Sequence, residues 1–143
     1  MVIIPYQKEH KPRLIEIFNL NTPKYFAPEE QADFETYLHE NGRNYYVLKS
    51  FNEIAGSGGF QFNGHVASIS WLMIDPDFKG EGFGMALFNH CLDKLRKKNV
   101  SAIEVMASEY AHKFFKKLGF DITEFHENFW NTGVDFFRMK KQL

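Results

Sequence analysis

A glycine-rich turn between an apolar strand and an amphipathic helix, at residues 72–87, constrains this chain more than any other feature. The chain turns at Asp75-Pro76 and places Gly80, Gly82 and Gly84 at alternate positions before the helix. Glycines there let a ligand approach the backbone without meeting Cβ atoms. The first N–H groups of the helix and the positive end of its dipole converge on the same point. The segment therefore predicts an anion site, with a phosphate group as the expected ligand.

The glycine spacing does not fit the two common phosphate-binding loops. A dinucleotide-binding G-x-G-x-x-G motif that began at Gly80 or Gly82 would need glycine in place of Met85 or Leu87. The P-loop pattern G-x-x-x-x-G-K-[ST] does not occur in the sequence. Two alternatives stay open at this point, a protein that holds ATP or NAD at this loop and a purely structural turn.

The composition indicates one globular domain, residues 1–143, with a sizeable core. A net charge of −1 argues against nucleic acid as a partner, and no apolar run is long enough to span a membrane. Residues 1–6 are too short an apolar run for a signal peptide. The single cysteine, Cys91, suits a reducing cytoplasm, and its place on a helical apolar stripe indicates packing rather than catalysis. Metal-ligand spacing of Cys and His is absent from the sequence, so no metal is expected.

The first half of the chain predicts a strand, two helices and a three-strand meander. Asn63-Gly64 is a strong hairpin signal, so the strands around it should pair antiparallel. The predicted elements are a strand at 2–6, a helix that starts near Pro12 and buries Leu14, Ile17 and Phe18, a two-proline loop at 21–28, a helix from about Glu29 to Asn41-Gly42, and strands at 45–50, 54–62 and 66–74.

The second half predicts a helical crossover and a terminal strand pair. The helix after the glycine turn carries an apolar stripe at Leu87, Cys91 and Leu95. A strand at 103–106 follows this helix, so it should lie parallel to the strand at 66–74. The last predicted elements are a helix at 111–118 that ends at Gly119, and antiparallel strands at 122–129 and 134–139 around Asn131-Thr132-Gly133.

This order of elements, with the glycine turn at its centre, resembles the GNAT superfamily of N-acetyltransferases over nearly the whole chain. Residues 72–87 are similar to that family's acyl-CoA signature, Q/R-x-x-G-x-G/A after a strand. Residues 108–120, which contain an aromatic pair and close in Lys117-Leu118-Gly119-Phe120, are similar to its later helix. The resemblance implies an α+β fold, with a mixed, mostly antiparallel twisted sheet of about six to seven strands, a splayed parallel central pair and about four flanking helices.

The resemblance also implies acetyl-CoA as co-substrate and assigns its binding residues. The backbone of Leu72 and Ile74 would pair with the pantetheine arm, and N–H groups of the glycine turn would hold the pyrophosphate. The implied cofactor-binding residues are Leu72, Met73, Ile74, Lys79, Gly80, Glu81, Gly82, Phe83, Gly84, Met85, Ser108 and Phe115.

Three positions depart from the family pattern. Lys79 replaces the usual Gln or Arg, which keeps a positive charge but loses the guanidinium fork. Ser108 stands where the family often has Asn. Phe115 stands where many members have a Tyr proposed to protonate the leaving thiolate, and phenylalanine has no proton to donate.

The candidate catalytic residues are Glu104 and Tyr110. Glu104, in the strand at 103–106, could deprotonate the amine through a water. Tyr110 could supply the hydroxyl that Phe115 lacks. A solvated or ion-paired carboxylate and a packing tyrosine are the structural alternatives. By resemblance, a backbone N–H near Ile74 would stabilise the oxyanion.

The acceptor site is expected between the early helices, the loop at 21–28 and the terminal hairpin. Its candidate walls are Tyr25, Phe26, Phe129 and Trp130, and the carboxylates that could attract a cationic amine are Asp33, Glu35 and Glu127. The leading hypothesis is acetyl transfer from acetyl-CoA to a primary amine of a small molecule or protein, by direct attack in a ternary complex. The alternative is an acyl-CoA-binding module with weak or lost catalysis. The exposed terminal strands could pair two copies as a homodimer.

Overall fold

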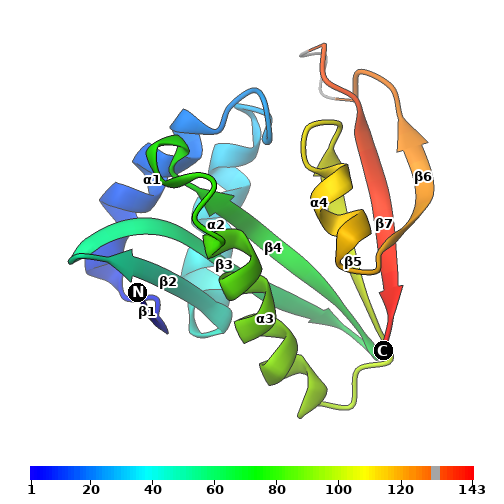
Figure 1. Cartoon of the computed structure of the whole chain (residues 1–143), viewed down its shortest axis with the longest axis horizontal. Helices are drawn as coiled ribbons and strands as arrows, with labels where there is room; N and C mark the ends of the chain where they lie inside the picture. Colours follow the sequence, from blue (N-terminus) through cyan, green and yellow to red (C-terminus); the bar gives the residue numbers. More distant parts are fainter. Residues whose placement is uncertain (130–132) are drawn as a thin grey trace.

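In the described residues, 1–129 and 133–143 of a computed structural model, seven strands form one mixed sheet in the order β1-β2-β3-β4-β5-β7-β6 (Figure 1). The strands are β1 (Val2–Pro5), β2 (Tyr45–Ser50), β3 (Glu53–Asn63), β4 (Val66–Ile74), β5 (Ala102–Ser108), β6 (Asp121–His126) and β7 (Phe136–Gln142). The helices are α1 (Lys11–Leu20), α2 (Glu30–Asn41), α3 (Phe83–Arg96) and α4 (His112–Lys117), with 3-10 turns η1 (Lys8–His10), η2 (Gly42–Asn44) and η3 (Pro76–Phe78).

The sheet consists of two antiparallel halves that meet at a short parallel junction. Strands β1 to β4 form one half, and β5, β7 and β6 form the other. Between the halves, β4 pairs with β5 only over 66–68 and 102–104. Figure 1 shows the two strands diverging beyond this junction. The fold class predicted from the sequence, with its splayed parallel pair, is therefore confirmed.

A bulge interrupts β4 at the point where it leaves β5. Gly59 pairs with Ser70 and Ser57 pairs with Met73, so Trp71 and Leu72 together oppose Gly58. Trp71 has a φ of 41°, in the left-handed region that an aromatic residue seldom adopts. The Tyr45 hydroxyl donates a hydrogen bond to the Trp71 carbonyl at 2.6 Å and holds this conformation in place. Such bulges re-aim side chains and often lie beside active sites.

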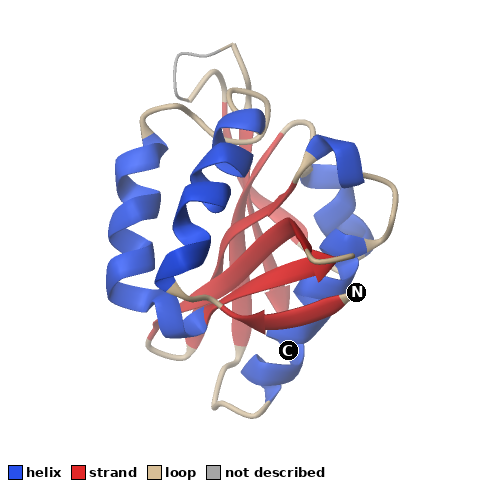
Figure 2. Cartoon of the chain, turned by 90° about the vertical axis from the view of Figure 1, so that its left-hand side faces the viewer, coloured by secondary structure: helices blue, strands red, loops and turns tan. Residues whose placement is uncertain are grey.

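Helices lie on both faces of the sheet (Figure 2), and each face has its own hydrophobic core. Because side chains alternate along a strand, Tyr45 and Val47 of β2 pack against α1 and α2, whereas Leu48 packs against α3. The predicted helical stripes are confirmed, with Leu14, Ile17 and Phe18 of α1 and Leu87, Cys91 and Leu95 of α3 all buried.

The last two strands differ from their predicted bounds. The predicted strand at 122–129 ends at His126, because residues 127–129 belong to the following turn. The strand predicted at 134–139 runs from Phe136 to Gln142, since its ladder with β5 continues to the end of that strand. Trp130 and Asn131-Thr132, which the sequence places at the acceptor wall and the turn, lie outside the described residues. None of the described helices is long and apolar enough to cross a membrane.

Candidate active site

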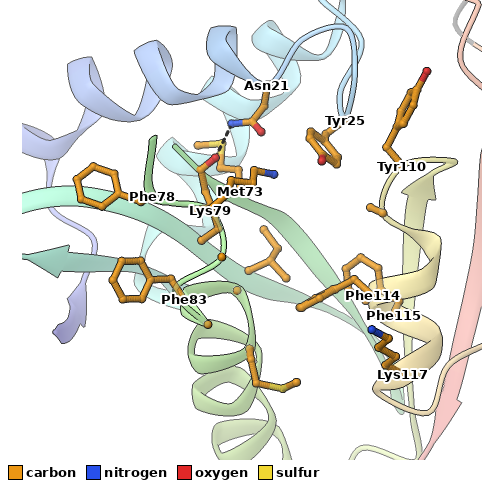
Figure 3. Close-up of a pocket in the computed structure, with 17 residues that line it drawn as sticks. Asn21, Tyr25, Met73, Phe78, Lys79, Phe83, Tyr110, Phe114, Phe115 and Lys117 are labelled. Atoms are coloured by element: carbon orange, nitrogen blue, oxygen red, sulfur yellow. Dashed lines mark hydrogen bonds between the residues drawn. The ribbon is translucent and has the colours of Figure 1, made fainter. Parts of the chain in front are cut away.

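A cleft of about 450 Å³ opens where β4 and β5 diverge (Figure 3). The end of β4, the glycine turn and the start of α3 form one wall, and α4 forms the facing wall. The lining residues are Asn21, Tyr25, Leu72, Met73, Ile74, Phe78, Lys79, Gly80, Gly82, Phe83, Gly84, Met85, Tyr110, Ala111, Phe114, Phe115 and Lys117.

Left-handed glycines shape the turn that enters the cleft. Gly80 has a φ of +83° and Gly82 a φ of +78°, so a side chain at either position would strain the backbone. A Cβ atom built at either glycine would meet nothing within 4 Å. The space above both residues is therefore open to a ligand.

The first turn of α3 presents free donors to this space. Its first helical hydrogen bond runs from Ala86 N to Gly82 O at 3.1 Å. The N–H groups of Phe83, Gly84 and Met85 consequently have no carbonyl partner four residues earlier within the helix. No acidic residue lies in this turn to compete for them or to repel an anion. The geometry suits a phosphate group.

Cationic and aromatic side chains line the mouth of the cleft (Figure 3). The Lys79 Nζ atom lies 3.9 Å from the centroid of the Tyr25 ring, which is a close cation–π contact. Lys24 lies 5.2 Å from the centroid of Tyr110, and the Tyr25 and Tyr110 rings meet edge-on at 6.5 Å. This group connects the loop after α1 with the start of α4. Lys117 adds a second positive charge to the cleft wall.

Helix α1 anchors the end of β4 and the turn that follows it. The buried Asn21 side chain donates to the Ile74 carbonyl at 3.0 Å (Figure 3) and to the Ile17 carbonyl at 2.9 Å. The Arg13 guanidinium forms an ion pair with buried Asp75 and donates to the Ile54 carbonyl at 3.1 Å. Asp75 in turn accepts from Asp77 N at 2.9 Å at the start of η3. These contacts fix where the glycine turn begins.

A second cavity, of about 230 Å³, lies beside the β4 bulge. Tyr25 lines both the cleft and this second cavity. The other residues that line it are Phe26, Glu30, Gln61, Ser68, Ile69, Ser70, Trp71, Glu104, Val105, Met106, Phe136 and Arg138. Glu104 lies 3.9 Å from the Arg138 guanidinium, measured from Oε2 to Nη1.

The structure brings most of the predicted cofactor residues together in the cleft, and it places the catalytic candidates apart. Tyr110 lines the cleft and is 53% exposed, whereas Glu104 lines the second cavity. Glu81 and Ser108 line neither of these two cavities. Ser108 is buried, and its hydroxyl has no hydrogen-bond partner among the described residues. Burial raises the pKa of Cys91 to about 12, which agrees with a packing role.

Only some of the residues predicted for the acceptor site line the second cavity. Tyr25 and Phe26 line the second cavity, whereas the described residue Phe129 does not. Asp33, Glu35 and Glu127 line neither of these two cavities, and Glu35 instead pairs with Lys11 at 3.1 Å. Besides Glu104, the second cavity is lined by the carboxylate of Glu30, which was not predicted from the sequence. Its signal was its place one residue into a helix directly after the aromatic loop, where Glu30 Oε2 accepts from Ala27 N at 2.8 Å.

Sequence analysis also missed several residues on the walls of the cleft. These residues are Asn21, Phe78, Ala111, Phe114 and Lys117. Ala111 and Phe114 are half-buried, pack against the core and also line the cleft. Phe114 lies close enough to α3 that a Cβ at Gly84 would lie 3.4 Å from its ring.

The family model of the acetyltransferase (GNAT) domain matches residues 11–143. The chain belongs to the GNAT family. The resemblance noted from the two sequence motifs is thereby confirmed. Among the described residues, no group of three or more His, Cys, Asp or Glu is placed to hold a metal ion.

Curated relatives match this GNAT chain over part of their length. The alanine N-acetyltransferase of ribosomal protein bS18 from Escherichia coli (strain K12) is 33% identical over 69 residues, which is 46% of this chain and 47% of that protein. An uncharacterized N-acetyltransferase of Methanocaldococcus jannaschii is 36% identical over 62 residues, 41% of this chain and 27% of that protein. The chain therefore covers less than half the length of these relatives.

Solved structures share the fold at low sequence identity. Ard1 from Thermoplasma volcanium superposes with a TM-score of 0.86 at 20% identity, covering 99% of this chain and 97% of that one. The ribosomal-protein-S18-alanine N-acetyltransferase from Escherichia coli gives a TM-score of 0.80 at 21% identity, covering 99% and 92%. N-acetylglutamate synthase from Neisseria gonorrhoeae, complexed with coenzyme A and N-acetyl-glutamate, gives 0.80 at 16% identity, covering 99% and 35%.

Proposed function

We propose that this protein transfers an acetyl group from acetyl-CoA to a primary amine of a small molecule or protein, by direct attack in a ternary complex. The observation that carries the proposal is the cleft between the splayed strands β4 and β5, which is lined by the glycine turn and by the first turn of α3 with its unpaired helical N–H groups. Membership of the GNAT family and a solved relative that holds coenzyme A support it.

The residues of the cleft suit coenzyme A. The open space above Gly80 and Gly82 and the donors of Phe83 to Met85 suit a pyrophosphate, which needs many N–H groups and no bulky Cβ. Lys79 and Lys117 supply positive charge nearby. The backbone of β4 at 72–74, which lies beyond the residues that pair with β5, would pair with the pantetheine arm. When bound, acetyl-CoA supplies the activated thioester.

The reaction needs a base, an oxyanion donor and a proton for the thiolate. A C–N bond forms between the amine and the acetyl carbon, the C–S bond breaks, and the amine loses one proton while the thiolate gains one. We assign the base to Glu104, acting through a water, and the proton donor to Tyr110. A backbone N–H near Ile74 would stabilise the developing oxyanion. Holding the amine beside the thioester is worth roughly 7–11 kcal/mol in favourable cases.

Calorimetric titration with acetyl-CoA tests the cofactor, with ATP and NAD as competing ligands. The test variant is Gly82→Trp, and the matched control is Gly64→Trp, because Gly64 also has a left-handed φ and open space but lies in the β3–β4 hairpin. We expect saturable binding of acetyl-CoA alone, lost in Gly82→Trp and kept in Gly64→Trp. Absence of acetyl-CoA binding by folded wild-type protein would contradict the proposal.

A second candidate function is an acyl-CoA-binding module with weak or lost catalysis. Phe115 favours it, because this residue lines the cleft and has no hydroxyl. Turnover separates the two functions. Release of free coenzyme A that depends on an added amine supports the transferase, whereas tight acetyl-CoA binding without transfer to any amine of a broad panel supports the module.

A further inference from the structure

The second cavity adjoins the cleft along β4. Residues 68–71 of the strand line the cavity and residues 72–74 line the cleft, so the bulge at Trp71 and Leu72 marks the boundary between them. Tyr25 belongs to both sites. A molecule in the cavity therefore lies next to a thioester held along the end of β4.

The charges that line the cavity favour a cation. Glu30 and Glu104 contribute two carboxylates, and Arg138 contributes one guanidinium. Arg138 is already engaged, since it lies 3.9 Å from Glu104 and 3.4 Å from Glu124. Glu30 forms no ion pair with any described residue, and its recorded hydrogen bond is from Ala27 N. A cationic ligand would give this half-buried carboxylate the partner that the described residues do not supply.

Glu30 is desolvated by its surroundings. Burial raises the pKa of its carboxyl, with Asp33 and Glu29 adding to the effect and the Ala27 N–H opposing it. An ionised carboxylate in such a place gains strongly from an ammonium group brought into contact with it.

The size of the second cavity and its aromatic walls restrict which ligands fit it. The cavity has about half the volume of the cleft, at about 230 Å³ against about 450 Å³. Tyr25, Phe26, Trp71 and Phe136 contribute aromatic walls, and aromatic faces attract ammonium groups. The indole N–H of Trp71 is buried and has no hydrogen-bond partner among the described residues. Its φ of 41° is a strained backbone conformation. A strained backbone and an unpartnered buried N–H group are both features of residues at functional sites.

The second cavity contains Tyr25 and Phe26, which the sequence assigns to the acceptor wall. We propose that Glu30 binds the ammonium group of the acceptor in this cavity and thereby selects compact primary amines. This inference rests on the proposed transferase function. A free small amine and the amino-terminal residue of a peptide carry the same chemical group. Glu30 holds the ammonium group, and Glu104, from β5, takes one proton from it through a water and passes this proton to solvent. The neutral amine then attacks, and the second proton that its nitrogen loses balances the one that the thiolate gains.

Steady-state kinetics on the full chain tests the role of Glu30. The acceptors are propylamine, an alanyl tripeptide amide and methoxyamine, which is a nucleophile that is uncharged at neutral pH. Glu30→Gln keeps an oxygen for Ala27 N, and Glu29→Gln removes the same charge from an exposed neighbour that does not line the cavity. Thermal unfolding and acetyl-CoA titration establish that each variant is folded and binds the cofactor.

We expect Glu30→Gln to raise the KM for propylamine or the peptide by about 10- to 100-fold, which is typical for the loss of a charge-assisted hydrogen bond. The KM for methoxyamine and the Kd for acetyl-CoA should stay unchanged, and Glu29→Gln should match wild type. Comparison of kcat/KM for propylamine with that for the peptide shows whether the acceptor is a free small amine or the amino terminus of a peptide.

Two results would overturn the inference about Glu30. One is an equal KM shift for charged and uncharged nucleophiles, or no shift, since either excludes recognition of the cation. The other is a wild-type protein that binds acetyl-CoA but acetylates neither compact amine. Failure to bind acetyl-CoA would instead defeat the proposed function itself, so the two failures are distinguishable.

Discussion

At the scale of single residues, the open question is how the chemistry proceeds with Phe115 in the cleft. Tyr110 lines the same cleft and is 53% exposed, and in Figure 3 its hydroxyl points out of the cleft, so the side chain has to turn inward to reach a thiolate. If it protonates the thiolate, Tyr110→Phe should lower kcat by roughly 10²- to 10⁴-fold with little change in acetyl-CoA affinity, because the ring remains. Steady-state kinetics measures both. Tyr25→Phe is the matched control, since its ring also lines the cleft, and equal kcat in both variants would assign Tyr110 to packing.

Glu104 is the candidate base on the wall of the second cavity. Glu104→Gln should lower kcat by roughly 10²- to 10⁴-fold if the carboxylate accepts the amine proton. Glu124→Gln is a fitting control, because Glu124 contacts the same Arg138 at 3.4 Å but does not line the cavity. A similar loss in both variants would mean that the disturbed arginine, rather than the base, limits the rate.

At the scale of elements, local signals in the sequence predicted the parts next to the cleft best. The strand at 66–74 and the opening of α3 came out as predicted because Asn63-Gly64 and the glycine turn punctuate the chain there. Glu30 was not predicted as a cavity residue, since the helical signal at the end of the aromatic loop does not reveal that α2 brings it to the same cavity as Glu104 of β5. The same limit applies to Asn21, whose bond to Ile74 joins segments far apart in sequence.

Asn21 connects α1 with β4. Its side-chain bonds to Ile17 and Ile74 tie the end of α1 to the end of β4, and the residue is only 2% exposed. Asn21→Ala leaves the Ile74 carbonyl without this donor, so it should reduce the free energy of unfolding by about 1–3 kcal/mol. It should also weaken acetyl-CoA binding, because the cleft wall begins there. Denaturant unfolding and calorimetry measure the two effects.

The control for Asn21 is its neighbour Thr22. The Thr22 hydroxyl donates to the Asn19 carbonyl at 2.9 Å but is exposed, and Thr22 does not line the cleft. Thr22→Ala should change both quantities little. Loss of stability in Asn21→Ala with unchanged acetyl-CoA affinity would show that the tie between α1 and β4 is structural alone.

At the scale of the whole molecule, both sites depend on one junction. Because β4 and β5 pair only over 66–68 and 102–104, the sheet remains continuous while its two halves separate above. The separation leaves the cleft on the α3 and α4 side, and the bulge at Trp71 ends the second cavity beside it. Glu30 therefore affects both ligand binding and folding stability, because folding removes water from its carboxylate.

The desolvation of Glu30 should make the free energy of unfolding depend on pH. Burial raises the folded-state pKa of Glu30 above its ordinary value of 4.5. The protonated form is then favoured by folding, so its stabilising contribution is present below that ordinary value and is lost as pH rises through the folded-state pKa. Glu30→Gln, which cannot ionise, should match wild type near pH 4 and become the more stable protein as pH rises to about 7.

Thermal unfolding of the two proteins across this pH range measures the difference, and other titrating groups cancel because both chains share them. Glu29→Gln should show a much smaller divergence, since Glu29 is exposed and its charge only adds to the effect that burial has on the pKa of Glu30. Propylamine at neutral pH should raise the Tm of wild type more than that of Glu30→Gln, because a ligand that binds the folded state stabilises it by mass action. A difference in Tm between wild type and Glu30→Gln that does not change with pH would show that the carboxylate is not desolvated in the folded protein. The argument that Glu30 binds a cation would then lose its physical basis.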